Sequence, residues 1–87
     1  MVTRATHEYA VPTKASFPYG IAVGADGNVY FTEASGNKLG RLIPSSGKIE
    51  EFPVSTAASM PWNIVAGPGR WLYFIEKSGN RLVKVRL

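Results

Sequence analysis

The segment YFTEASGNKL at residues 30–39 returns as YFIEKSGNRL at residues 73–82, an offset of 43 positions. Extending the comparison outward aligns residues 5–44 with residues 48–87 without a gap and gives 15 identities in 40 pairs. In the N-terminal arm the matching pairs are Glu8 with Glu51, Val11 with Val54 and Thr13 with Thr56. Self-similarity at one fixed offset is the sequence signature of a repeat architecture.

Each repeat unit consists of short apolar stretches separated by turn residues. We predict strands over residues 20–23, 28–33, 38–43 and 48–54 in the first unit, and over 63–66, 71–75 and 81–85 in the second. Asp26-Gly27 is a hairpin turn signal, and Phe52 and Val54 are apolar residues at the period of two that is typical of a strand. Four short antiparallel strands every ~40–45 residues predict a blade of a β-propeller, so the fold class is all-β.

The size and composition of the chain limit what it can be. It has 87 residues, no cysteine and a net charge of +4. The basic residues are scattered, so we expect no nucleic-acid partner, and no apolar run reaches the ~18 residues of a membrane span. The first residues lack an apolar core and predict no signal peptide, with the cytoplasm as the default location. A core this small is marginal, and disulfides cannot support it.

Two blades are fewer than the roughly 4–8 that a propeller needs to close. We therefore predict that residues 1–87 form a single two-blade unit, with blade one over about 18–54 and blade two over about 61–87. Its function would be self-assembly, in which copies of the chain close a ring head to tail with cyclic symmetry. Three chains would give a six-bladed ring, which we favour, and four would give eight blades.

The arm at residues 7–11 matches the predicted outer strand at residues 50–54. We expect the arm to add as the outer strand to the second blade of a neighbouring chain, which would cover two exposed sheet edges. The predicted closure residues are His7, Tyr9 and Val11 of the arm and Leu82, Val83 and Val85 of the receiving strand. The partner of the chain is thus the chain itself.

Residues 17–33, with 35–42 and 49–54 after them, resemble the repeat of the streptogramin (virginiamycin B) lyases and, less closely, that of NHL-like propellers. The resemblance implies a propeller fold. Those lyases are seven-bladed single chains that open the lactone of a cyclic depsipeptide by elimination, with Mg²⁺ and a histidine base. Their functional histidines lie near the start of innermost strands, which correspond to residues 18–20 and 61–63 here and contain none. We therefore expect no catalytic residue and no cofactor, with the Mg²⁺-dependent lyase as the alternative.

The loops at 14–19 with 33–37, and at 57–63 with 76–80, should open on one end of the blades. The residues there nearest the ring axis are Tyr19, Trp62 and Asn63. They could bind a flat or sugar-like small ligand, or pack between blades.

Glu33 and Glu76 end equivalent strands. Their carboxylates could hold Mg²⁺ or Ca²⁺, or accept hydrogen bonds from the backbone of the Ser-Gly-Asn turn that follows each of them. Asn37 and Asn80 should adopt a left-handed or turn conformation there.

Overall fold

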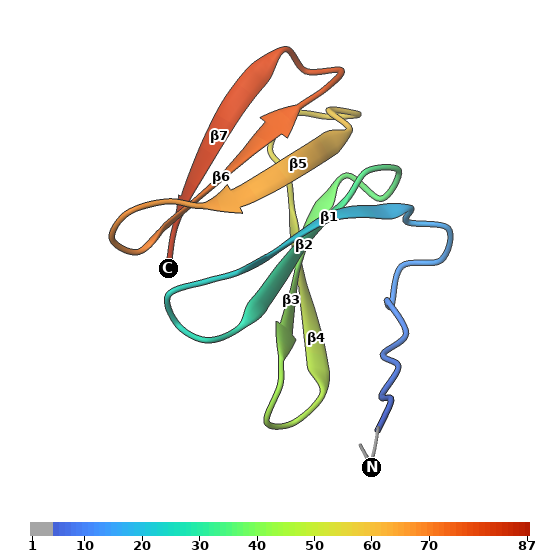
Figure 1. Ribbon diagram of the computed structural model, residues 1–87. Coiled ribbons are helices and arrows are strands. Elements are labelled where there is room, and N and C mark those ends of the chain that lie inside the picture. The colour runs from blue at the N-terminus through green and yellow to red at the C-terminus, as the bar shows by residue number, and fades with distance from the viewer. Residues whose placement is uncertain (1–4) are drawn as a thin grey trace.

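The computed structural model describes residues 5–87 as two antiparallel sheets that lie side by side (Figure 1). The first sheet has the order β1-β2-β3-β4 and the second the order β5-β6-β7. The strands are β1 (Pro18–Val23), β2 (Val29–Glu33), β3 (Lys38–Ile43), β4 (Lys48–Pro53), β5 (Pro61–Ala66), β6 (Trp71–Glu76) and β7 (Arg81–Arg86). Within these described residues, no helix is long and apolar enough to cross a membrane.

The turn between β1 and β2 shows how the local sequence sets the blade geometry. Gly27 has a φ of +81°, which its missing side chain allows. The carboxylate of Asp26 accepts hydrogen bonds from the backbone N–H of Asn28 at 3.0 Å and from the hydroxyl of Tyr30 at 2.5 Å. The predicted Asp-Gly hairpin is therefore confirmed, and its aspartate is a structural residue.

In the first sheet an aromatic ring packs directly on a glycine. Phe31 on β2 lies opposite Gly40 on β3, and a Cβ on Gly40 would overlap the ring of Phe31. The second sheet pairs Phe74 with Val83 at the equivalent place. The residue opposite the phenylalanine on the middle strand therefore differs between the blades: it is glycine in the first and valine in the second.

The substitution Gly40→Ala should destabilise the chain by about 1–3 kcal/mol, the usual cost of overpacking a filled site. Chemical denaturation would measure the change in the free energy of unfolding. Gly27→Asn is the matched control, because a Cβ at Gly27 meets no neighbour and asparagine tolerates a left-handed turn. An equal loss in both variants would contradict the packing argument.

The hydrophobic core lies between the two sheets. Its buried members are Tyr30 and Leu39 of the first sheet and Ile64, Leu72 and Phe74 of the second. Strands β1 and β2 both contact β5, the first strand of the second sheet. This arrangement, one sheet packed face to face on the next repeat unit, is that of two neighbouring propeller blades.

The N-terminal arm, unlike the blades, forms no strand. Residues 5–17 contain no strand, and residues 5–10 are exposed. In Figure 1 the arm runs away from the second sheet, and its Tyr9 and Val11 line one pocket with Ile21 and Phe31 of the first sheet. Residues 7–11 therefore add to no sheet within the described chain, and their pairing with a neighbouring chain stays a prediction.

Candidate functional site: two free sheet faces and the loop end

Side chains of a strand alternate between the two faces of its sheet. We call the face that carries Phe31 in blade one and Phe74 in blade two the front face, and the opposite one, with Tyr30 and Tyr73, the back face. The core places the back of blade one, with Tyr30, against the front of blade two, with Phe74. On the front of blade one, Tyr9 and Val11 of the arm line a hollow with Ile21 and Phe31. No other sheet covers this face or the back of blade two within the described residues, and we call these two the free faces.

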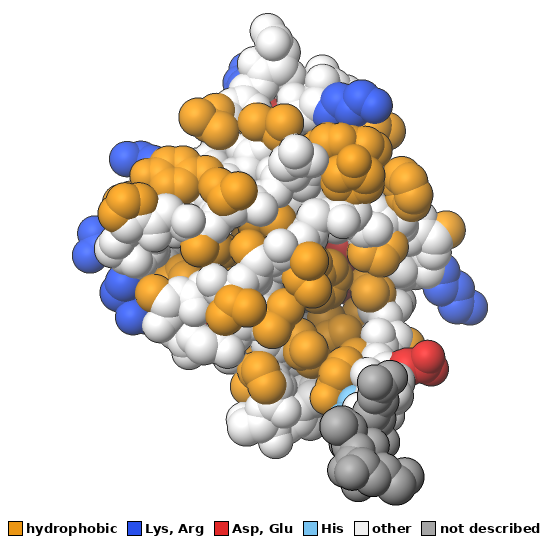
Figure 2. Space-filling view, in the orientation of Figure 1, with side chains coloured by type: hydrophobic (Ala, Val, Ile, Leu, Met, Phe, Trp, Pro, Cys, Tyr) orange, Lys and Arg blue, Asp and Glu red, His pale blue; other side chains and the backbone are white. Residues whose placement is uncertain are grey.

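Equivalent side chains on the buried and free faces differ sharply in exposure. Ile21, on the free front of blade one, is 71% exposed, whereas its counterpart Ile64 is 7% exposed. Leu82, on the free back of blade two, is 69% exposed, whereas its counterpart Leu39 is 5% exposed. Figure 2 shows hydrophobic side chains gathered across much of the visible surface. Each free face is therefore the counterpart of a face that the chain already buries between its own blades.

The hydroxyl of Thr32, which the sequence did not single out, connects the two blades by hydrogen bonds. The backbone N–H of Gly20 donates to Thr32 Oγ1 at 3.0 Å, and the Thr32 hydroxyl donates to the carbonyl of Trp62 at 2.6 Å. Thr32 is fully buried. Its counterpart in blade two is Ile75, which is 41% exposed on the free back face. The only sequence signal for this bridge is a polar residue in one repeat where the other has an apolar one.

Asn37 has a second role beyond its turn. Asn37 and Asn80 have φ angles of 57° and 56°, which confirms the predicted left-handed conformation. The side chain of Asn37 also donates to the carbonyl of Thr56 at 3.0 Å and accepts from the hydroxyl of Ser59 at 2.6 Å. It thereby fixes the loop that enters blade two.

The predicted ligand residues meet at the loop end. The rings of Tyr19 and Trp62 stack with centroids 3.6 Å apart, and the ammonium of Lys77 lies 4.5 Å from the centroid of the Trp62 ring. Asn63 is exposed beside them. The stack occupies one face of each ring, so these aromatics contribute to packing between blades. Ligand binding by Tyr19, Trp62 and Asn63 stays a prediction.

The predicted hydrogen bonds of Glu33 to the following turn were wrong. The N–H groups of Ser35 and Gly36 donate instead to the carbonyl of Ser16, at 2.9 and 3.1 Å. Glu33 is fully buried, and neither of its carboxyl oxygens has a hydrogen-bond donor. The backbone of the entering loop competes better for these N–H groups than the carboxylate does.

Another acid, Glu51 on β4, lies near Glu33. Burial raises the pKa of Glu33 to about 7, and the negative charge of the Glu51 carboxylate adds to the rise. Burial alone would raise the pKa of Glu51, but the hydrogen bond from Thr13 and the charge of Lys38 contribute to lowering it overall. Glu33 is therefore the group that holds the proton.

Glu76 occupies the equivalent buried place in blade two, where its Oε1 also has no partner. Within residues 5–87, no three acidic or histidine side chains gather as a metal-ligand set. A metal at Glu33 or Glu76 thus stays a prediction without a third ligand beside it.

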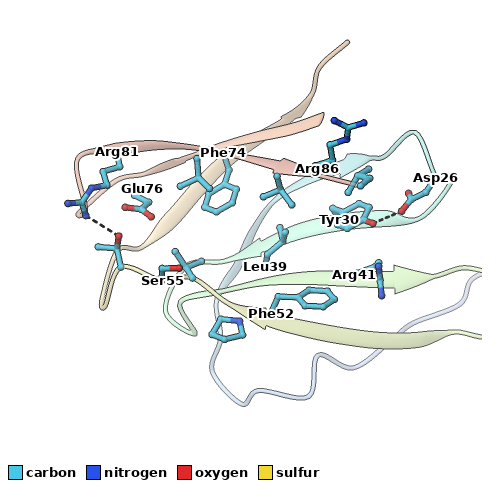
Figure 3. Close-up of a pocket in the computed structure, with 16 residues that line it drawn as sticks. Asp26, Tyr30, Leu39, Arg41, Phe52, Ser55, Phe74, Glu76, Arg81 and Arg86 are labelled. Carbon is cyan, nitrogen blue, oxygen red and sulfur yellow. Dashed lines mark hydrogen bonds between the residues drawn. The ribbon is translucent and has the colours of Figure 1, made fainter. Parts of the chain in front are cut away.

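A groove of about 610 Å³ opens between the sheets beside β7 (Figure 3). Blade two lines it with Glu76, Arg81 and Val83, and blade one with Leu39 and Phe52. The groove lies on the front face of blade two, next to the outer edge of β7. In the first sheet, β4 lies at the corresponding edge.

The chain resembles characterised proteins along its whole length. The sequence model of the virginiamycin B lyase family matches residues 1–87. The virginiamycin B lyase of Bacillus licheniformis is 53% identical over 38 residues, which cover 44% of this chain and 13% of that protein. The structure of the Staphylococcus aureus virginiamycin B lyase superposes with a TM-score of 0.75 at 37% identity. A catalytically inactive variant of that enzyme with quinupristin gives a TM-score of 0.76 at the same identity.

The matches to solved structures cover nearly all of this chain but a minor part of each relative. The chain is covered to 93% by the Staphylococcus aureus structure and spans 30% of that protein. A streptogramin B lyase structure gives the same coverage at 33% identity, with a TM-score of 0.75. The repeat, the blade geometry and the family match agree. The chain belongs to the virginiamycin B lyase family.

Proposed function

We propose that this chain is a two-blade propeller module that closes a ring with copies of itself. In the ring, the free front of blade one packs on the free back of blade two of the next chain. The observation that supports this is the exposure of Ile21 and Leu82, whose counterparts Ile64 and Leu39 are buried where the two blades meet. The chain contains one example of the interface that it would form with its neighbour.

The energetic argument favours association. Burying one isoleucine or leucine side chain contributes about 1.5–3 kcal/mol. Val23, Val65 and Ile75 are also 62%, 59% and 41% exposed on the two free faces. A chain of 87 residues has a marginal core, so covering these faces would add a large part of its total stability.

The solution mass tests this proposal directly. We expect light scattering after size exclusion to give three times the 9.4 kDa of one chain, which corresponds to a six-bladed trimer. Four times that mass would support self-assembly with eight blades. A mass of 9.4 kDa at micromolar concentration would overturn the proposal, because both free faces would then be stable in water.

Lyase activity is not extended to this chain. The relatives are virginiamycin B and streptogramin B lyases, each more than three times as long as the matched part. Removing a proton in an elimination needs a base at the reacting carbon. The single histidine, His7, lies exposed on the arm, away from the loop end with Tyr19 and Trp62. No arrangement in the blades therefore favours this second function.

A further inference from the structure

We infer that residues 6–10 of a second copy fill the groove beside β7, adding to its outer edge so that Glu8 of that copy lies between Thr56 and Arg81. The inference rests on the proposed self-assembly and specifies how one chain holds the next. The inference is based on a comparison of the two blades. Blade one contains the complete site, and blade two, within the described residues, contains the same site without the counterpart of Glu51.

The complete site in blade one is built around Glu51. The backbone N–H of Thr13 donates to Glu51 Oε2 at 3.3 Å. The ammonium of Lys38 donates to Thr13 Oγ1 at 2.8 Å and lies 3.9 Å from Glu51 Oε1. The buried carboxyl of Glu33 lies beside the same group. One carboxylate thus joins the outer strand to the incoming loop and to β3.

The incomplete site in blade two has the equivalent groups in the equivalent relation. Arg81 takes the place of Lys38, and its Nη1 donates to Thr56 Oγ1 at 3.0 Å. Glu76 takes the place of Glu33 and is buried with Oε1 unpartnered. The counterpart of Glu51 at the same 43-residue offset is Glu8. Glu8 is exposed on the arm, so within residues 5–87 no carboxylate occupies the place that Glu51 has in blade one.

The register of the added strand follows from the pairing of β3 with β4. In blade one the opposite residues are Leu39 with Phe52, Gly40 with Glu51 and Arg41 with Glu50. Replacing each β3 residue by its counterpart in β7, and each β4 residue by its counterpart in the arm, gives the pairs Leu82 with Tyr9, Val83 with Glu8 and Lys84 with His7. Val83 lines the groove, and opposite residues share one face. Glu8 of the second copy would therefore point into the groove, and Tyr9 would point to the back face with Leu82.

A backbone hydrogen bond in blade one also predicts how the added strand would end. In blade one the backbone N–H of Val54 donates to the carbonyl of Asn37 at 3.0 Å. The equivalent bond would join Val11 of the second copy to the carbonyl of Asn80. The charges agree as well, because Arg81 and Arg86 line the groove that receives the acidic side chain. Of the predicted closure residues, His7, Tyr9, Val11, Leu82 and Val83 thus obtain specific partners.

A disulfide between chains tests the register. The chain has no cysteine of its own. In Tyr9→Cys/Leu82→Cys the two thiols would face each other across adjacent antiparallel strands, where opposite Cα atoms are about 4.5–5.5 Å apart and within disulfide reach. Oxidation should give covalent dimers and trimers on a non-reducing gel. In the control Tyr9→Cys/Val83→Cys the thiols would project to opposite faces and should not cross-link.

The charge of Glu8 gives an independent measurement. Glu8→Ala removes a charge-assisted hydrogen bond, so the dissociation constant of the assembly should rise roughly ten- to a hundredfold. Ser45→Lys is the control, because it changes the net charge by the same amount at an exposed turn that does not line the groove. The control should change the dissociation constant less than twofold.

The possible outcomes separate the inference from the proposal beneath it. Multimers by light scattering without the Tyr9–Leu82 cross-link, or with equal cross-linking of the control, would overturn the strand register and leave self-assembly intact. A disulfide only within single chains would mean that the arm occupies its own edge, which also overturns it. A single-chain mass for the unaltered protein would remove the proposed function itself.

Discussion

Replacing Ile21 by lysine should convert the assembled protein into single folded chains. Ile21 is 71% exposed in one chain, so a lysine there would keep its ammonium in water and leave the fold intact. In the assembly the same position would become as buried as Ile64, which is 7% exposed. Burying an unpaired ammonium costs several kcal/mol, and this cost would recur at every contact between chains.

Light scattering and circular dichroism together check this prediction. The variant should have the mass of one chain and an unchanged β-sheet spectrum. Ser45→Lys is the control, because it adds the same charge at an exposed turn outside both free faces and should leave the assembly unchanged. An Ile21→Lys variant with the mass of the unaltered assembly would mean that the front of blade one is not the contact surface.

The second large effect concerns pH and Glu33. Its pKa is about 7 in the folded chain, against an ordinary 4.5. Between these values the folded state holds a proton that the unfolded state has lost, so stability should fall as pH rises from 4.5 to 7 and then level off. A shift of this size corresponds to roughly 3 kcal/mol. Glu33→Gln removes the titration, and the variant should be more stable than the unaltered chain at pH 8 by about that amount.

Denaturation curves from pH 4.5 to 8, at one protein concentration, would measure this difference. At pH 5 the two proteins should have nearly equal stability, because Glu33 is protonated there and glutamine resembles the neutral acid. Glu50→Gln serves as the control, since Arg41 lowers the pKa of Glu50 and moves its titration below this window. A parallel pH dependence in Glu33→Gln and the unaltered chain would show that Glu33 is not the group responsible.

Much of the fold could be predicted because the chain contains two similar repeat units, and each unit supports the strand and turn assignments of the other. The offset of 43 residues placed every strand to within about two residues, and it placed Asn37 and Asn80 in their left-handed turns. These features depend on local residue type. The left-handed φ angles of 52° at Ala15 and 53° at Phe17 could not be predicted, because neither residue type favours that conformation. Contacts of the neighbouring Ser16 carbonyl with the next turn accompany them.

The candidate site could be predicted only in part. The sequence predicted residues for the proposed ring closure, which stays a prediction, but it did not predict the hydrogen bond from Arg81 to Thr56 on which the inferred carboxylate site rests. It also suggested a backbone partner for Glu33, where the structure places Glu51 instead. In both cases the deciding contact joins residues from different strands, and propensity and spacing do not determine such contacts. The structure of blade one supplied the missing geometry for blade two.

The difference between Thr32 and Ile75 has a thermal consequence. The interface between the two blades of one chain contains the hydrogen bonds of the Thr32 hydroxyl. The proposed interface between chains would have Ile75, which has no hydroxyl, at that position. Association through such apolar contacts carries a negative heat-capacity change and loses strength in the cold. On chilling, the ring should therefore come apart between chains while each pair of blades stays joined.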